Sequence, residues 1–117
     1  MQASTAAFLR HLERERNASP HTIRAYGEDL AQFTDHLRRE IGREPRPEDA
    51  DHLAIRGFLA ELHRRGLAKS SSARKLAGLR TFFRYLCREG RLETNPARIL
   101  ATPRPSKQEG AMRAYVI

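Results

Sequence analysis

Apolar side chains recur at intervals of three and four along much of the chain, and this spacing predicts amphipathic helices. The segment that organises the rest is residues 69–90. Its apolar positions are Leu76, Leu79, Phe83 and Leu86, with Phe82 at the edge of the stripe. The opposite face is predicted to carry Arg74, Gly78, Thr81, Tyr85 and Arg88. We therefore expect one long helix with a buried stripe and a basic outer face.

Three further segments have the same kind of pattern. In residues 20–41 the apolar positions are Ile23, Tyr26, Leu30, Phe33 and Leu37. Shorter stripes lie before residue 16, with Phe8, Leu9 and Leu12, and between residues 51 and 66, with Ile55, Phe58, Leu59 and Leu62. A glycine inside a helix costs about 1 kcal/mol relative to alanine, so Gly27 indicates close packing or the close approach of another surface.

Residues that favour helix ends mark two of these helices clearly. Ser19 followed by Pro20 predicts a capped start for the second helix, and Gly42 predicts its end. Asp51 is expected to cap the third helix, which Gly66 ends.

The other boundaries rest on similar signals. Ser4 or Thr5 is expected to cap the first helix, and Ser70 is expected to cap the fourth, which Gly90 ends. Asn95-Pro96 repeats the cap-then-proline pattern and predicts a short helix over residues 96–100.

No strand pattern is present, and the connections are short, so we predict an all-α fold. We expect a small orthogonal helical bundle of four main helices plus a short C-terminal helix. Residues 43–50, which hold two prolines and several charges, are predicted to form a surface loop. Residues 1–101 are expected to form one domain, followed by a linker and tail over residues 102–117.

Charge narrows the choice of partner. The 117 residues include 22 Lys plus Arg against 14 Asp plus Glu, which gives a net charge of +8 and a pI of about 10.7. This bias favours a polyanionic partner. No apolar run is long enough to span a bilayer, and the first residues do not resemble a signal peptide, so we expect no membrane role. A single cysteine, Cys87, excludes an internal disulfide and fits a reducing cytoplasm.

Catalytic and metal-binding patterns are missing from the sequence. None of the five histidines forms an i,i+4 pair with another histidine or with the cysteine, so a zinc site is not expected. There is no glycine-rich phosphate loop and no nucleophile elbow. We expect no cofactor, no metal and no catalytic residue in this chain.

Two helix starts combine hydroxyl and basic groups, which are the groups that contact DNA phosphates. The candidate DNA-binding residues are Ser19, His21, Thr22, Arg24, Lys69, Ser70, Ser71, Ser72, Arg74 and Lys75. An exposed arginine can also read guanine in the major groove. The simpler interpretation is capping for the hydroxyls and a solvated surface for the arginines.

Three stretches in this order resemble one protein family. They are NASPHTIRAYGEDLAQF at residues 17–33, FLAELHRRGLAKSSSARKLAGLRTFFRYL at residues 58–86, and ETNPA at residues 93–97. Ser19, Thr22, Tyr26, Asp29 and Leu30 fit the family's S-x-x-T-x-x-x-Y-x-x-D-L pattern. The chain resembles the N-terminal core-binding (SAM-like) domain of XerC/XerD-type tyrosine recombinases over about residues 4–105.

The resemblance implies a DNA-binding module that forms half of a clamp around double-stranded DNA, in chromosome dimer resolution or DNA integration. It implies that the second and fourth helices contact backbone and major groove. The implied partners are a catalytic domain in the same chain when full length, and further recombinase protomers on DNA. In the family, recombination proceeds through a covalent tyrosine–phosphate intermediate, which this chain alone is not expected to form.

The sequence departs from the family at Ala77 and Gly78, where the pattern has a small polar residue followed by alanine. Residues 110–117 do not resemble the family's continuation, and we assign them no function. Two alternatives stay open at this point. One is a helical protein-interaction domain with a basic surface for an acidic partner, and the other is an RNA-binding helical module.

Overall fold

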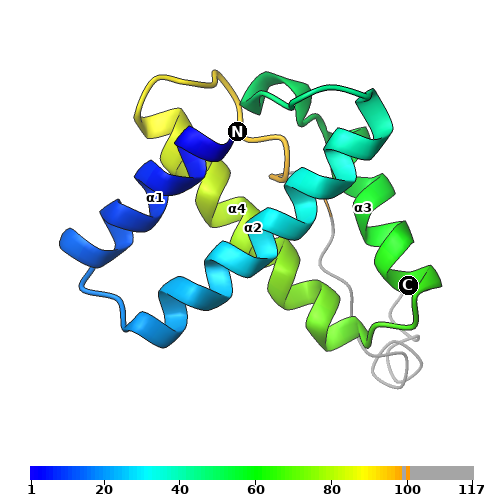
Figure 1. Cartoon of the computed structure of the whole chain (residues 1–117), viewed down its shortest axis with the longest axis horizontal. Helices are drawn as coiled ribbons and strands as arrows, with labels where there is room; N and C mark the ends of the chain where they lie inside the picture. The colour runs from blue at the N-terminus through cyan, green and yellow to red at the C-terminus, as the bar shows by residue number, and fades with distance from the viewer. Residues whose placement is uncertain (99, 101–117) are drawn as a thin grey trace, which may run out of the picture.

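The computed structural model describes residues 1–98 and residue 100, and within that part of the chain it contains four α-helices and no strand. The helices are α1 (Gln2–Arg14), α2 (Pro20–Ile41), α3 (His52–Arg64) and α4 (Lys69–Arg88). A short 3-10 helix, η1 (Pro47–Asp49), lies between α2 and α3. The predicted all-α bundle of four main helices is confirmed (Figure 1).

Several helix ends form as the sequence predicts. The Ser19 hydroxyl accepts a hydrogen bond from the backbone N–H of Thr22 at 3.1 Å, and Asp51 accepts one from that of Ala54 at 2.8 Å. Both bonds satisfy N–H groups that the first turn of a helix leaves without a partner. Gly42 and Gly90 follow α2 and α4 with φ values of 76° and 79°, a left-handed conformation that favours glycine.

Two predicted caps are wrong. The fourth helix begins at Lys69 and its N-cap is Ala68, so Ser70 lies inside the first turn and does not cap it. Ala68 takes the extended conformation of a cap without offering a side-chain acceptor. The first helix begins at Gln2, ahead of the predicted Ser4 or Thr5, and Ser4 is buried inside α1. In both cases the chain becomes helical one or more residues before the hydroxyl that we expected to start it.

α4 packs against α1, α2 and α3, and α2 likewise packs against each of the other three helices. In Figure 1, α2 and α4 cross each other, while α1 lies on one side of the crossing and α3 on the other. Gly78 lies at the α2–α4 crossing, where a Cβ atom would be 3.5 Å from the Tyr26 ring. At Gly27 it would be 3.5 Å from the Leu9 side chain on α1, which confirms the close packing predicted there.

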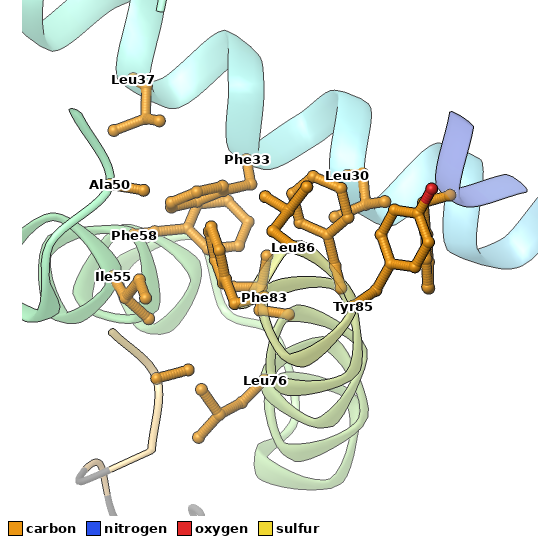
Figure 2. Close-up of a cluster of buried hydrophobic side chains, with 14 of the residues drawn as sticks. Leu30, Phe33, Leu37, Ala50, Ile55, Phe58, Leu76, Phe83, Tyr85 and Leu86 are labelled. Carbon is orange, nitrogen blue, oxygen red and sulfur yellow. The ribbon is translucent and has the colours of Figure 1, made fainter. Parts of the chain in front are cut away.

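Aromatic rings fill the interior where the helices meet. Phe33 of α2 contacts Phe58 of α3 and Phe83 of α4, with ring centroids 5.3 and 6.2 Å apart. Figure 2 shows these rings together with aliphatic side chains from α2, α3 and α4. Phe8 of α1 extends the cluster toward Phe82, at 5.4 Å. One continuous core therefore connects all four helices.

The buried face of α4 is wider than the sequence pattern predicts. Gly78 and Tyr85, which we expected on the outer face, are buried, and Phe82 is fully buried. The reason is that α4 has neighbours on three sides, so a single stripe at intervals of three and four underestimates its contact area. The predicted amphipathic helix is correct, but its predicted outer face is wrong at these two residues.

The connection between α2 and α3 is more ordered than a plain surface loop. It contains η1, and Pro45 and Pro47 are buried. The Asp49 carboxylate accepts hydrogen bonds from the Arg43 guanidinium at 2.7 and 2.9 Å and from the backbone N–H of Arg46 at 2.7 Å. These bonds, the Arg43 bond foremost, lower the pKa of Asp49 to about 2.

After α4 the chain returns along its side. The Asn95 side chain accepts from the N–H of Ala97 and donates to the carbonyl of Arg80, and the Arg80 guanidinium donates to the carbonyls of Ala97 and Leu100. Residues 96–98 form a turn. The short helix predicted over residues 96–100 includes residue 99, which lies outside the described residues. The predicted linker and tail over residues 102–117 also lie outside them.

Candidate nucleic-acid interface

A groove of about 280 Å³ runs between the N-terminal half of α2 and the first half of α4. We call it the α2–α4 groove. From α2 it is lined by His21, Thr22, Ala25, Tyr26 and Asp29, and from α4 by Arg74, Ala77, Gly78 and Thr81. Both helices begin along the lower edge of Figure 1, so their N-termini lie on the same side of the bundle. The partial positive charges of two helix dipoles are therefore on one edge of the molecule.

The start of α2 is held by its own hydroxyls. The Ser19 hydroxyl donates to Thr22 Oγ1 at 3.0 Å while accepting from the Thr22 backbone N–H. Both side chains are exposed, as are His21 and Arg24 in the same turn. The capping role expected of Ser19 is thus present, and it leaves the first turn accessible to a ligand.

An ionic cluster joins α2 to α4 at the edge of the groove. Asp29 Oδ1 accepts from Lys75 Nζ at 2.7 Å, and Asp29 Oδ2 accepts from Arg74 Nη1 at 2.7 Å. Lys75 Nζ also donates to Gln32 Oε1 at 2.8 Å. The side chains of Asp29 and Lys75 are each only 8% exposed, whereas that of Arg74 is 56% exposed. A buried carboxylate is therefore paired with one internal and one external cation.

The structure brings only part of the predicted set into the groove. His21, Thr22 and Arg74 line it. Four others are exposed at the two helix starts outside it: Ser19, Arg24, Lys69 and Ser70. Ser71 is half-buried, while Ser72 and Lys75 are buried. The last two are therefore directed to the interior of the bundle, where Lys75 meets a carboxylate of its own chain.

Several groove residues were not among the predicted contacts. They are Ala25, Tyr26, Asp29, Ala77, Gly78 and Thr81. Asp29 carries a signal in the sequence, because it lies one turn after Tyr26 and one turn before Phe33 on the stripe that should face the core. A carboxylate on a buried stripe needs a partner. Lys75, on a helix already expected to pack there, was available as that partner.

A second hollow, of about 530 Å³, lies between α1 and the C-terminal end of α4. Its charged lining residues are Arg10, Arg14, Glu15, Arg16, Arg88 and Glu89. The His11 ring lies 4.9 Å from the Tyr85 ring and within 3.4 Å of the Arg88 guanidinium. This basic surface has more arginines than the α2–α4 groove, but none of them makes an ion pair with a buried carboxylate of the described part of the chain.

The described residues contain no group of three or more His, Cys, Asp or Glu side chains that could hold a metal ion. No helix among the residues described here has both the length and the apolar character needed to cross a membrane.

Residues 5–90 match the family described as phage integrase, N-terminal SAM-like domain, and the chain belongs to this family. Among curated proteins, it is similar to tyrosine recombinase XerC of Pelobacter propionicus, with 49% identity over 98 residues, 84% of this chain and 32% of that protein. Tyrosine recombinase XerC of Azotobacter vinelandii is 43% identical over 108 residues, 92% of this chain and 36% of that protein. No solved structure matches the chain significantly.

These matches confirm the family suggested by the three sequence stretches, and they support a domain of a site-specific recombinase. The chain spans about a third of the length of the curated relatives it matches.

Proposed function

We propose that this chain is the DNA-binding core-binding domain of a site-specific tyrosine recombinase, and that it forms half of a clamp around the recombination site. The process would be chromosome dimer resolution or DNA integration. The observation that carries the proposal is the shared edge at which α2 and α4 begin, with Arg74, His21 and Thr22 around one groove. The match to XerC recombinases supports it independently.

The proposed docking face is the N-terminal half of α2 together with the first half of α4. Its contacts are Ser19, Thr22 and Arg24 from α2, and Ser71 and Arg74 from α4. His21, Lys69 and Ser70 are exposed beside them and complete the face. We leave Ser72 and Lys75 out of the proposed contacts because both side chains are buried. Backbone N–H groups at the two helix starts would add to the phosphate contacts.

The rest of the recombinase reaction belongs to the longer protein that we propose. Residues 1–101 would be the DNA-binding domain, and residues 102–117 would lead toward a catalytic domain in the same chain. Other protomers would bind the same site. This chain alone should neither cut nor join DNA. Tyr115 lies in the tail over residues 110–117, to which we assigned no function. A covalent adduct between the purified chain and a duplex, lost on Tyr115→Phe, would contradict that expectation.

The docking face is tested by binding to duplex DNA over a range of salt concentrations. Arg24→Ala with Arg74→Ala removes two exposed cations from the proposed face. Arg39→Ala with Arg56→Ala removes two exposed cations from the C-terminal half of α2 and the N-terminal half of α3. Each lost phosphate contact should flatten the dependence of log K on log salt by nearly one unit. We expect the first pair to weaken binding and flatten the slope, and the second pair to change little.

The choice of control follows from the ion pairs. Arg38 pairs with two carboxylates, Asp35 at 2.6 Å and Glu44 at 3.1 Å, whereas Arg74 shares the single carboxylate of Asp29 with Lys75. The charge of Arg38 is therefore more fully compensated than that of Arg74, and its loss would be a poor comparison. Equal losses from the Arg24/Arg74 and Arg39/Arg56 pairs would mean that net charge alone drives binding. An RNA duplex of the same sequence is the second probe, and tighter binding to RNA would favour the RNA-binding alternative.

A protein-interaction function is the second candidate, and the hollow between α1 and the end of α4 is the observation that favours it. Four arginines around the paired His11 and Tyr85 rings provide a basic surface for an acidic partner. Arg14→Ala with Arg88→Ala tests whether DNA binds this surface instead of the proposed docking face. If this pair weakens DNA binding more than the Arg24/Arg74 pair does, the duplex lies on the second hollow and the proposed docking face is wrong.

A further inference from the structure

The ionic cluster at the groove holds one arginine in a defined orientation. Arg74 Nη1 donates to Asp29 Oδ2 at 2.7 Å, and Asp29 is fixed in turn by Lys75 on its other oxygen. The carboxylate cannot turn away easily, because its own side chain and that of Lys75 are buried. The guanidinium therefore has one restrained end, although more than half of its side chain is exposed.

This arrangement suits a base contact better than a phosphate contact. A phosphate needs only a nearby cation, and a carboxylate 2.7 Å from that cation weakens its attraction for an anion. A base edge is neutral and needs fixed donors, since guanine is recognised by paired hydrogen bonds to O6 and N7. Restraint before binding also lowers the conformational entropy lost when those bonds form.

The donors that guanine would need are available. The structure contains no hydrogen bond from Nε or Nη2 of Arg74 to another described residue. The groove beside Arg74 is lined in part by the small residues Ala25, Ala77 and Gly78, with the Tyr26 ring on the α2 side. A base edge could therefore approach as closely as the hydrogen bonds require.

We propose that Arg74 recognises a guanine in the major groove through hydrogen bonds to its O6 and N7, and that Asp29 is the positioning residue that orients the guanidinium. Lys75 acts from the interior by keeping the Asp29 carboxylate paired. The inference rests on the proposed DNA-binding function. It assigns sequence recognition to one side chain of the docking face, whereas Arg24, which has no such restraint, is left to phosphates.

The first experiment uses the complete 117-residue chain and a pool of DNA duplexes with a random central sequence. The wild-type chain should enrich a guanine at one position. Arg74→Lys keeps the charge but loses the paired donors, so this preference should fall roughly 5- to 150-fold while the salt dependence stays unchanged. Arg64→Lys, in an exposed ion pair with Glu61 on α3, is the matched control and should leave the preference intact.

The positioning role of Asp29 needs a variant that folds. Asp29→Asn leaves Lys75 buried without its counter-ion, so Asp29→Asn with Lys75→Met provides a neutral interior of similar volume. In both variants the guanine preference should fall at the same position, while binding to random DNA is retained or strengthened because an acid has been removed. An unchanged preference in a folded variant would overturn the role of Asp29.

The second experiment replaces the selected guanine by 7-deazaguanine, which lacks the N7 acceptor. The wild-type chain should lose affinity. Arg74→Ala should lose none, because the variant has no guanidinium to bind N7 in the first place. A contrary outcome is that Arg74→Ala weakens duplex binding without changing either the guanine preference or the sensitivity to 7-deazaguanine. In that case Arg74 contacts phosphate and this inference is wrong. Failure of the wild-type chain to bind duplexes at all would instead refute the proposed function.

Discussion

The two halves of α4 have different kinds of partners. In the first half, the buried residues include Ser72, Lys75 and Gly78, and Lys75 makes an ionic contact across to Asp29 of α2. In the second half the buried side chains are apolar or aromatic, and Phe83 contacts Phe33 of α2 and Phe82 of its own helix at 6.2 and 5.1 Å. One helix therefore has a polar contact region followed by an apolar one.

This contrast suggests that the second half of α4 mainly stabilises the fold, while the first half mainly orients side chains at the surface. Apolar burial stabilises without fixing the direction of any polar group, because it is non-directional. Ion pairs contribute less net stability but impose a geometry. The first half of α4, which borders the proposed DNA face, is the half held by directional contacts. Three predictions test this division, and a fourth concerns the effect of pH on the fold.

Phe83→Ala should have the largest effect on stability. The ring is fully buried, and its removal should cost about 3–5 kcal/mol in the free energy of unfolding. Urea unfolding followed by circular dichroism measures this cost. At a temperature where the variant is still folded, its affinity for DNA should equal that of the wild-type chain. A loss of affinity in the folded state would mean that the two halves are not separate in function.

Lys75→Ala should come next, at about 3 kcal/mol, because it leaves a buried carboxylate with only the external Arg74 as partner. The same unfolding measurement applies. Asp29→Asn with Lys75→Met should recover most of the loss, since the buried charges are removed together. If Lys75→Ala proves neutral, the buried ion pair does not stabilise the fold, and the first half of α4 is not held by this contact.

Gly78→Ala tests the boundary between the halves and should be mildly stabilising, by about 0.5–1 kcal/mol. Alanine favours the helix, and its Cβ would meet the Tyr26 ring at 3.5 Å, an ordinary contact distance. Gly27→Ala, with the Leu9 side chain at 3.5 Å, is the parallel variant and should behave alike. A lower melting temperature for Gly78→Ala alone would show that the α2–α4 crossing has no room for a methyl group.

The smallest effect is expected from pH, through His36. Burial lowers its pKa below the usual value of 6.5, with Glu40 partly opposing this. Because the folded state disfavours the protonated ring, its contribution to stability is present above about pH 6.5 and declines as the pH falls below that value. Urea unfolding at about pH 7.5 and about pH 5 should show a smaller loss on acidification for His36→Gln than for the wild-type chain. An equal loss would assign the effect to other groups.

The sequence predicted the helices well because their signals are local. The Ser19 cap, Pro20 at the first helical position and Gly42 in the left-handed conformation depend only on neighbouring residues. The wrong caps at Ser70 and at Ser4 or Thr5 show the limit of this approach. A hydroxyl near a helix start fits both the cap and the first turn, and contacts elsewhere decide which it becomes.

The candidate site was less predictable because it depends on contacts between distant residues. Arg74 and Lys75 are adjacent in the sequence and were given the same role, yet one is exposed and the other buried. Their difference in exposure arises because Asp29, about 45 residues earlier, is buried and pairs with both side chains where α2 packs on α4. Local sequence patterns do not predict how two helices pack against each other. The DNA contacts themselves stay predictions.

The position of α4 at the end of the bundle also has a consequence for synthesis on the ribosome. α1, α2 and α3 each pack against α4, which is the last of the four helices to be translated. Until it leaves the exit tunnel, the apolar faces of the earlier helices have only each other as cover. We therefore expect the nascent chain to stay loosely folded and dependent on chaperones until α4 emerges, and then to collapse in one cooperative step.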